Sequence, residues 1–285
     1  MPPVFCKERV DNINGFNLNE KEGLYYLEPS LFAKERKIKA GFSARKGGVS
    51  EGNYASLNLA VHTGDDSSSV LENRRRFLSV WGLSPRGIIA GNQVHGTTVH
   101  RVKESDFAGN SRTGTIIPAC DALISNTDNV TLAAFSADCL LIYIFNRDKK
   151  VISLIHAGWR GILYGIIGKV AGILKKDYLC YHESSIAAVS PGICFDCFEV
   201  GEEVAGKFHK EGWQDAACLR QGPAGTYFIN LTEIACRQLN SAGLQRNRVD
   251  VSGLCTSCMP DLFYSYRRDG EKTGRMMAFM SLTCQ

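Results

Sequence analysis

The residues best suited to chemistry in this 285-residue chain are two histidines and one cysteine. His95 lies in the segment GNQVHG (91–96), and His156 stands between an apolar run and a glycine turn. Cys139 follows Asp138 at the start of another apolar run. Two imidazoles and a thiolate are ordinary zinc ligands, and three protein ligands leave a fourth tetrahedral position for water or substrate. Zinc held in this way lowers the pKa of bound water to about 7 and so supplies a nucleophile.

The same side chains allow other interpretations. Asp138, next to the thiolate, is a candidate proton carrier or a residue that orients a ligand. Without metal, Cys139 could be a nucleophile with His156 or His95 as its base. In a purely structural alternative, both histidines are hydrogen-bonded in the core and the cysteine is a small buried residue. The spacing of the three residues matches no short motif, so it leaves all three alternatives open.

A hairpin would bring Cys139 and His156 together. Residues 140–155 consist of two apolar runs of strand length, LLIYIF and VISLI, joined by five polar residues. This pattern favours a β-hairpin, which places the two side chains near each other at one end of a sheet. Apolar residues then recur at helical spacing over residues 159–174, so a helix is expected after the glycine turn.

Two glycine-rich turns carry arginines that could bind an anion. The turn HAGWRG (156–161) joins a strand to a helix, and backbone N–H groups at a helix N-terminus attract anions. Arg160 in this turn could add a guanidinium fork for phosphate. Arg45 in the turn SARKGG (43–48) is a second candidate. The alternative is that both arginines are surface residues of ordinary turns.

The remaining segments predict one α/β domain. Residues 37–42 resemble a strand, and residues 65–81 a helix whose Arg74–Arg76 triplet forms a solvated face. Residues 230–239 begin with a capping-box pattern, and two strands within 262–282 are expected to form a hairpin. Because no Pro/Ser-rich linker divides the chain, we expect mixed sheets with helices over at least one face.

Composition narrows the class of protein. Hydrophobic residues make up 44% and charged residues 22%, which is typical of globular chains. The net charge of +4 is too small to indicate nucleic acid, and no apolar run is long enough to cross a membrane. The eleven cysteines are an odd number, and several lie in apolar runs, as reduced thiols do. We therefore expect a cytoplasmic, soluble monomer with neither nucleic acid nor membrane as partner.

Four of these cysteines form two Cys-x-x-Cys pairs. The first pair is Cys194 and Cys197, and the second is Cys255 and Cys258. The 57 residues from 198 to 254 separate the pairs, which is longer than a zinc ribbon allows. We interpret the four as structural thiols rather than as a zinc site.

Eight short motifs occur in order along residues 40–282. They are GFSARKGGVS (41–50), SLNL (56–59), QVHG (93–96), DAL (121–123), ADC (137–139), HAGWRG (156–161), CFEVG (197–201) and FYSYRRDG (263–270). In this order they resemble the YfiH-like, laccase-domain family of purine nucleoside phosphorylases, once called multicopper polyphenol oxidases. One departure is Ala44, where the family often has Thr, and it changes little.

The resemblance implies an α/β fold, a single-domain, layered α/β/β/α sandwich with mixed sheets. It would cover residues 37–285 as the catalytic domain, preceded by a short N-terminal segment, residues 1–36. The implied activities are phosphorolysis of adenosine, inosine and methylthioadenosine and deamination of adenosine, so the partners would be a purine nucleoside and phosphate. The cofactor would be Zn²⁺.

The resemblance also assigns site residues by motif position. The metal ligands would be His95, Cys139 and His156, the trio reached above from chemistry. Asp138, Cys139 and His156 would be the catalytic group. The positions that border the site, and so would bind substrate, are Arg45, Asn58 and Arg160.

Two alternatives to a nucleoside enzyme remain. A copper-dependent polyphenol oxidase would need a His₂Cys site and a histidine-rich copper cluster, for which six histidines are too few. A single copper in the trio is still compatible with the sequence, because divalent copper binds most such sites more tightly than zinc. The other alternative, suggested by relatives named peptidoglycan-editing factors, is a protein that edits or binds a cell-wall muropeptide.

Overall fold

The apolar runs after Cys139 form the inner layer of the protein. In the computed structural model, which describes residues 15–107 and 114–283, strands β9 (Leu140–Asn146) and β10 (Val151–Ala157) form the predicted antiparallel hairpin, and every residue of both is buried. Successive β9 side chains belong to two different hydrophobic cores, as the alternation of a strand requires. A strand that is apolar on both faces must be covered on both sides.

This hairpin lies at the centre of a six-stranded mixed sheet. Its order is β15-β11-β9-β10-β7-β5, with β15 parallel to β11 and β5 parallel to β7. The other strands are β15 (Val249–Val251), β11 (Ser185–Val189), β7 (Ala122–Ser125) and β5 (Val99–Arg101).

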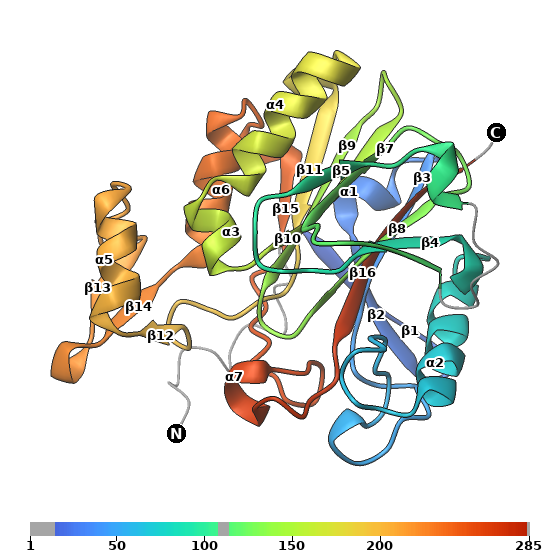
Figure 1. Ribbon diagram of the computed structural model, residues 1–285, viewed down its shortest axis with the longest axis horizontal. Coiled ribbons are helices and arrows are strands. Elements are labelled where there is room, and N and C mark those ends of the chain that lie inside the picture. Colours follow the sequence, from blue (N-terminus) through green and yellow to red (C-terminus); the bar gives the residue numbers. More distant parts are fainter. Residues whose placement is uncertain (1–14, 108–113, 284–285) are drawn as a thin grey trace.

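A seven-stranded mixed sheet packs against one face of the six-stranded sheet (Figure 1). Its order is β1-β2-β3-β16-β8-β4-β6. The strands are β1 (Phe16–Lys21), β2 (Leu24–Pro29), β3 (Ile38–Ser43), β16 (Met276–Leu282), β8 (Thr131–Ser136), β4 (Ile88–Gly91) and β6 (Thr115–Ile117). The core between the two sheets includes Phe42, Tyr143 and Met280.

Helices cover the outer face of each sheet (Figure 1). On the six-stranded sheet lie α3 (Trp159–Leu163), α4 (Ile166–Tyr178) and α6 (Leu231–Ser241). On the seven-stranded sheet lies α2 (Ser67–Ser79), which contributes Phe77 and Leu78 to a third core. The two short helices are α1 (Ser30–Ala33) and α7 (Tyr266–Asp269). The layers therefore run α/β/β/α, which confirms the predicted fold class.

The chain between β11 and β15 makes an excursion from the sandwich. It forms a small antiparallel sheet and α5 (Glu202–Lys210) before α6 returns to the main body. The order of the small sheet is β12-β14-β13, with bounds β12 (Glu199–Val200), β14 (Tyr227–Ile229) and β13 (Leu219–Gln221). At the start of α6, Asn230 accepts a hydrogen bond from the Glu233 N–H, so the predicted N-cap is confirmed.

Several local predictions need correction. The helix after His156 is broken into α3 and α4 at Gly165, whose φ of 73° ends the first helix. Arg74 does not belong to a solvated face: its side chain is fully buried, and its Nε donates to the Leu59 carbonyl at 2.8 Å. The predicted C-terminal hairpin does not form, because β16 pairs with β3 and β8 and the segment before it contains α7.

The N-terminal segment is partly described. Residues 1–14 lie outside the described part of the chain. The rest of residues 1–36, for which the sequence indicated no regular element, contains β1, β2 and α1, and β2 pairs with β3 of the seven-stranded sheet. Over the described ranges, no helix has both the length and the apolar character needed to cross a membrane.

Candidate metal centre and cavity

Two connections between the sheets and one strand end carry the predicted ligands. His95 lies on the connection from β4 to β5 and has a φ of 59°. Cys139 lies on the short connection from β8 to β9, and His156 is the penultimate residue of β10. One ligand atom from each lies within 4.8 Å of the other two. The structure thus brings the three residues together at one end of the sandwich.

Gly158 makes room for this trio. A β-carbon at this position would lie 2.8 Å from His95 Cδ2 and 3.1 Å from Cys139 Sγ. Both distances are shorter than ordinary van der Waals contact, so a side chain here would push the ligands apart. The two imidazoles and the thiolate therefore meet beside Gly158, and this set of ligands fits a single zinc or copper ion.

Asp121 organises two of the ligands and was missed by the sequence analysis. Its buried carboxylate accepts hydrogen bonds from His156 Nδ1 and the His95 N–H, both at 2.9 Å, and from the Gly96 N–H at 2.8 Å. A carboxylate on Nδ1 leaves Nε2 to face a metal, as is common for metal-binding histidines. The DAL motif contains this aspartate, but nothing local in the sequence connects it with His156.

The trio is electrostatically coupled when no metal is bound. Burial alone would raise the pKa of Cys139, but the nearby imidazoles of His156 and His95 lower it to about 6. Burial alone would lower the pKa of His156, but the Cys139 thiolate and the Asp121 carboxylate raise it to about 9. At neutral pH the cysteine is therefore mainly a thiolate, the form that binds metals and acts as a nucleophile.

The trio lines a cavity of about 480 Å³, a size suited to a small organic ligand. Gln93, Asp138 and Ile193 are among its lining residues. The lining also includes six aromatic or cationic side chains: Phe135, Phe198, Tyr266, His62, Arg267 and Arg275. The cavity therefore combines flat apolar surfaces with positive charge, beside the candidate metal centre.

Asp138 lies on the cavity wall with both carboxylate oxygens held. Oδ1 accepts from Thr256 Oγ1 at 2.6 Å, and Oδ2 accepts from the Arg267 N–H at 2.7 Å. Burial raises the pKa of this carboxyl, and the two hydrogen bonds oppose that shift. Its φ of 102° is in the left-handed region, which shows that surrounding structure fixes the backbone here.

The three predicted substrate residues lie outside this lining. Arg45 donates to the Ala55 and Pro260 carbonyls and stacks on a tyrosine ring. The Asn58 side chain is buried and forms hydrogen bonds with the backbone of its own loop. The Arg160 guanidinium lies 4.3 Å from the Trp159 ring centroid. Asn58 nevertheless supports the cavity, because its Oδ1 accepts from the Arg275 N–H at 2.9 Å. A direct role of these residues in substrate binding stays a prediction.

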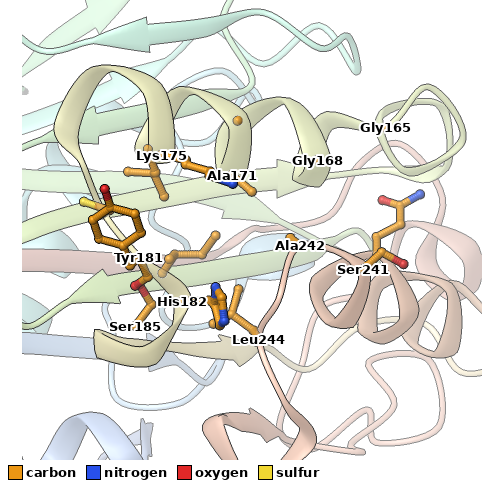
Figure 2. Close-up of a pocket in the computed structure, with 15 residues that line it drawn as sticks. Gly165, Gly168, Ala171, Lys175, Tyr181, His182, Ser185, Ser241, Ala242 and Leu244 are labelled. Atoms are coloured by element: carbon orange, nitrogen blue, oxygen red, sulfur yellow. The ribbon is translucent and has the colours of Figure 1, made fainter.

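A second cavity, of about 520 Å³, lies apart from the metal ligands. Figure 2 shows it between α4, which contributes Gly168 and Lys175, and the chain after α6, which contributes Ala242 and Leu244. None of the predicted site residues lines this cavity. The cavity at the trio is therefore the one where the candidate chemistry is located.

Comparison with known proteins defines the class. Residues 39–283 match the family described as multi-copper polyphenol oxidoreductase laccase. The chain is 34% identical to purine nucleoside phosphorylase YlmD of Geobacillus stearothermophilus, over 85% of this chain and 89% of the relative. It is 32% identical to purine nucleoside phosphorylase YfiH of Escherichia coli, over 86% and 94%. Adenosine deaminase RL5, from an unknown prokaryotic organism, is 29% identical over 87% and 96%.

Solved structures agree with this assignment. The crystal structure of YlmD from Geobacillus stearothermophilus superposes with a TM-score of 0.87 at 32% identity, covering 95% of this chain and all of the other. A Bacillus licheniformis protein described as hypothetical protein YfiH gives 0.86 at 28% identity, with the same coverage. The protein is a member of this laccase-domain enzyme family. Within it, the chain belongs with the YfiH-like proteins, as the motifs indicated.

Proposed function

We propose that the protein is a zinc-dependent purine nucleoside phosphorylase that acts on adenosine, inosine and methylthioadenosine and also deaminates adenosine. The observation that carries the proposal is the convergence of His95, Cys139 and His156 in the lining of a cavity of nucleoside size. The names of the relatives, purine nucleoside phosphorylase and adenosine deaminase, support the same chemistry.

Arg275 is suited to bind phosphate. Its Nη1 donates to the carbonyls of Thr273 and Gly274, which fixes the guanidinium at the cavity wall. Its Nε and Nη2 have no partner among the described residues, so both can donate to an anion. His62 and Arg267 line the same cavity and add donors or positive charge. A guanidinium binds phosphate through two parallel hydrogen bonds, which also orients it.

The aromatic side chains are suited to hold the purine. Tyr266 and Phe198 line the cavity on the side of Arg267, and flat rings of this kind stack on bases. In phosphorolysis, a phosphate oxygen bonds to the anomeric carbon as the bond from that carbon to the purine nitrogen breaks. The departing purine then takes up a proton. Asp138 lines the cavity, and we assign it the acid–base role in this transfer.

His95, Cys139 and His156 would hold the zinc ion, which when bound supplies a Lewis acid and an activated water. Asp121 keeps His156 in the tautomer that such binding needs. In deamination of adenosine, water replaces the exocyclic amino group and ammonia leaves. One cavity can support both reactions, because each requires a bound purine nucleoside beside Asp138 and the metal centre.

The family description favours one second candidate, a copper-dependent phenol oxidase. The trio could hold a single copper. A multicopper set needs a further histidine cluster, and among residues 15–107 and 114–283 the only other His/Cys/Asp/Glu group of ligand geometry consists of four cysteines. We therefore place phenol oxidation behind nucleoside chemistry.

The test is turnover of a nucleoside panel by purified protein of known zinc content. Inosine should yield hypoxanthine only when phosphate is present, and adenosine should yield inosine and ammonia without it. Cys139→Ser should abolish both reactions. His100→Ala is the control, because His100 pairs with Asp106 outside the cavity. Phosphate-independent release of hypoxanthine, full activity of Cys139→Ser, or copper-dependent oxygen consumption with a phenol would each contradict the proposal.

A further inference from the structure

The two Cys-x-x-Cys pairs, which the sequence analysis kept apart, meet in the structure. The four sulfur atoms of Cys194, Cys197, Cys255 and Cys258 all lie within 4.8 Å of one another. Cys197 Sγ and Cys258 Sγ, one from each pair, are 3.3 Å apart. The prediction that the 57 residues between the pairs keep them from forming one site was wrong, because the pairs meet in space. It failed because sequence separation was used to judge spatial separation.

Parallel pairing of two strands explains how the pairs meet. β11 and β15 are parallel neighbours at one side of the six-stranded sheet, and each precedes one of the pairs. The two connections that follow run side by side, with Gly192 and Cys255 paired in a parallel bridge. The 57 residues from 198 to 254 include the excursion. The first pair therefore lies where the chain leaves the sandwich, and the second pair lies after the chain has returned to it.

The distances fit one tetrahedral metal ion. In a zinc site with four thiolates at about 2.3 Å, the sulfur–sulfur separation is about 3.8 Å. The range set by the 3.3 Å contact and the 4.8 Å limit includes this value. A disulfide, in contrast, would need a sulfur–sulfur distance of about 2.05 Å. An iron–sulfur cluster, with its bridging sulfides, holds its thiolates further apart than a single ion does.

The surroundings are those of a thiolate site. Cys255 is buried, and its Sγ accepts hydrogen bonds from the backbone N–H groups of Cys194 at 3.3 Å and Cys258 at 3.4 Å. Two arginines fix the backbone of the two pairs: Arg267 donates to the Cys197 carbonyl at 3.1 Å, and Arg268 donates to the carbonyls within the second pair at 2.8 and 3.0 Å. Arg267 places a positive charge beside the site, whereas the charge of Arg268 is paired with Asp269.

We propose that Cys194, Cys197, Cys255 and Cys258 bind one structural zinc ion, separate from the metal at the cavity. Four cysteine ligands leave no open position, which is the character of a structural rather than a catalytic zinc site. The ion would clamp the two ends of the excursion to each other.

The four-cysteine site is connected to the cavity by two neighbouring residues. Phe198, next to Cys197, lines the cavity, and Thr256, next to Cys255, donates to Asp138 at 2.6 Å. Both residues therefore depend on the two pairs for their position. Loss of the ion would free the ends of a long loop, which weakens the fold and the placement of these two side chains together.

The decisive experiment isolates this site in the full-length protein. His95→Ala removes one of the three ligands of the trio, which weakens zinc binding there and leaves the four cysteines as the one complete set of ligands among the described residues. Purified with reductant and without added metal, the variant should contain one zinc per chain. X-ray absorption should give four sulfur neighbours at about 2.3 Å. No retained zinc, a shell that contains nitrogen, or iron in place of zinc would overturn the assignment.

A second comparison tests the ligands themselves. The Cys197→Ser/Cys258→Ser variant should lose one zinc per chain and lower the Tm by about 10 °C, because a structural ion contributes directly to folding. Cys236→Ser is the matched control, since Cys236 is a half-buried cysteine in α6, outside the group of four. Equal zinc content in the two variants would refute the proposal, as would a native disulfide between Cys197 and Cys258. If the double variant does not fold, the His95→Ala measurement still decides.

Discussion

Asp121→Asn is the sharpest test of how the metal centre is organised. The Asp121 carboxylate accepts three hydrogen bonds of 2.8–2.9 Å, from His156 Nδ1 and from the N–H groups of His95 and Gly96. Asparagine has nearly the same shape but only one acceptor oxygen and no charge. Its NH₂ group would face at least one of these donors, so His156 would lose either its orientation or its preferred tautomer.

The expected size of the effect follows from these contacts. A hydrogen bond to a charged group contributes about 1.5–3 kcal/mol, and 1.4 kcal/mol corresponds to a tenfold change in an equilibrium constant. Removal of a carboxylate behind a metal-binding histidine typically costs about 10- to 100-fold in metal affinity or activity. We therefore expect Asp121→Asn to release zinc from the trio at a chelator concentration about 10 to 100 times lower than wild type requires.

The assay is chelator competition followed by metal analysis, with nucleoside turnover measured in parallel. Asp106→Asn is the matched control, because Asp106 also accepts from a histidine, His100, at 2.8 Å but lies outside the cavity lining. Thermal melts of both variants separate lost metal affinity from lost stability. Zinc retention by Asp121→Asn equal to that of Asp106→Asn would refute the assigned role of Asp121.

Three further predictions concern single positions. Gly158→Ala, whose β-carbon would press on two ligands, should lower zinc affinity at least about tenfold in a metal titration. Gly168→Ala, on open helix surface, should instead raise the stability in thermal melts by about 0.5–1 kcal/mol. Unchanged zinc affinity of Gly158→Ala, or lower stability of Gly168→Ala, would contradict the geometry. Arg74→Ala should cost about 2–4 kcal/mol in denaturant unfolding and Arg75→Ala less than about 0.5, because only the first side chain is buried. Burial raises the pKa of Asp250 to about 6, so its protonated form stabilises the fold below pH 4 and this contribution is lost as pH rises through 6. The Tm of Asp250→Asn relative to wild type should therefore rise between pH 4 and pH 7, and a flat difference would show that the carboxyl is not perturbed.

The sequence predicted the parts of the fold that depend on local pattern. The apolar runs of the hairpin and the period of the following helix are local signals, and they place Cys139 and His156 at one end of a sheet. His95 could be added only through its chemistry and motif, because no local pattern connects it with the hairpin. The break at Gly165 was missed because the apolar period continues across it.

Features that depend on long-range packing could not be predicted in this way. Arg74 appeared to face solvent because charge suggests exposure, but a carbonyl and the Phe135 ring compensate its burial. Asp121 reaches the trio through contacts between strands far apart in the sequence. The four cysteines meet because β11 and β15 are parallel neighbours, a pairing that the intervening excursion hides from any measure of spacing.

The position of the trio has a mechanical consequence. His95 and Cys139 belong to two of the connections that cross from the seven-stranded to the six-stranded sheet, and His156 belongs to the six-stranded sheet itself. An ion bound by all three residues links the two sheets at this edge of the sandwich. Separation of the sheets at this edge would pull the three ligands apart, so the rate at which the ion is released sets an upper limit on how often the sheets separate there.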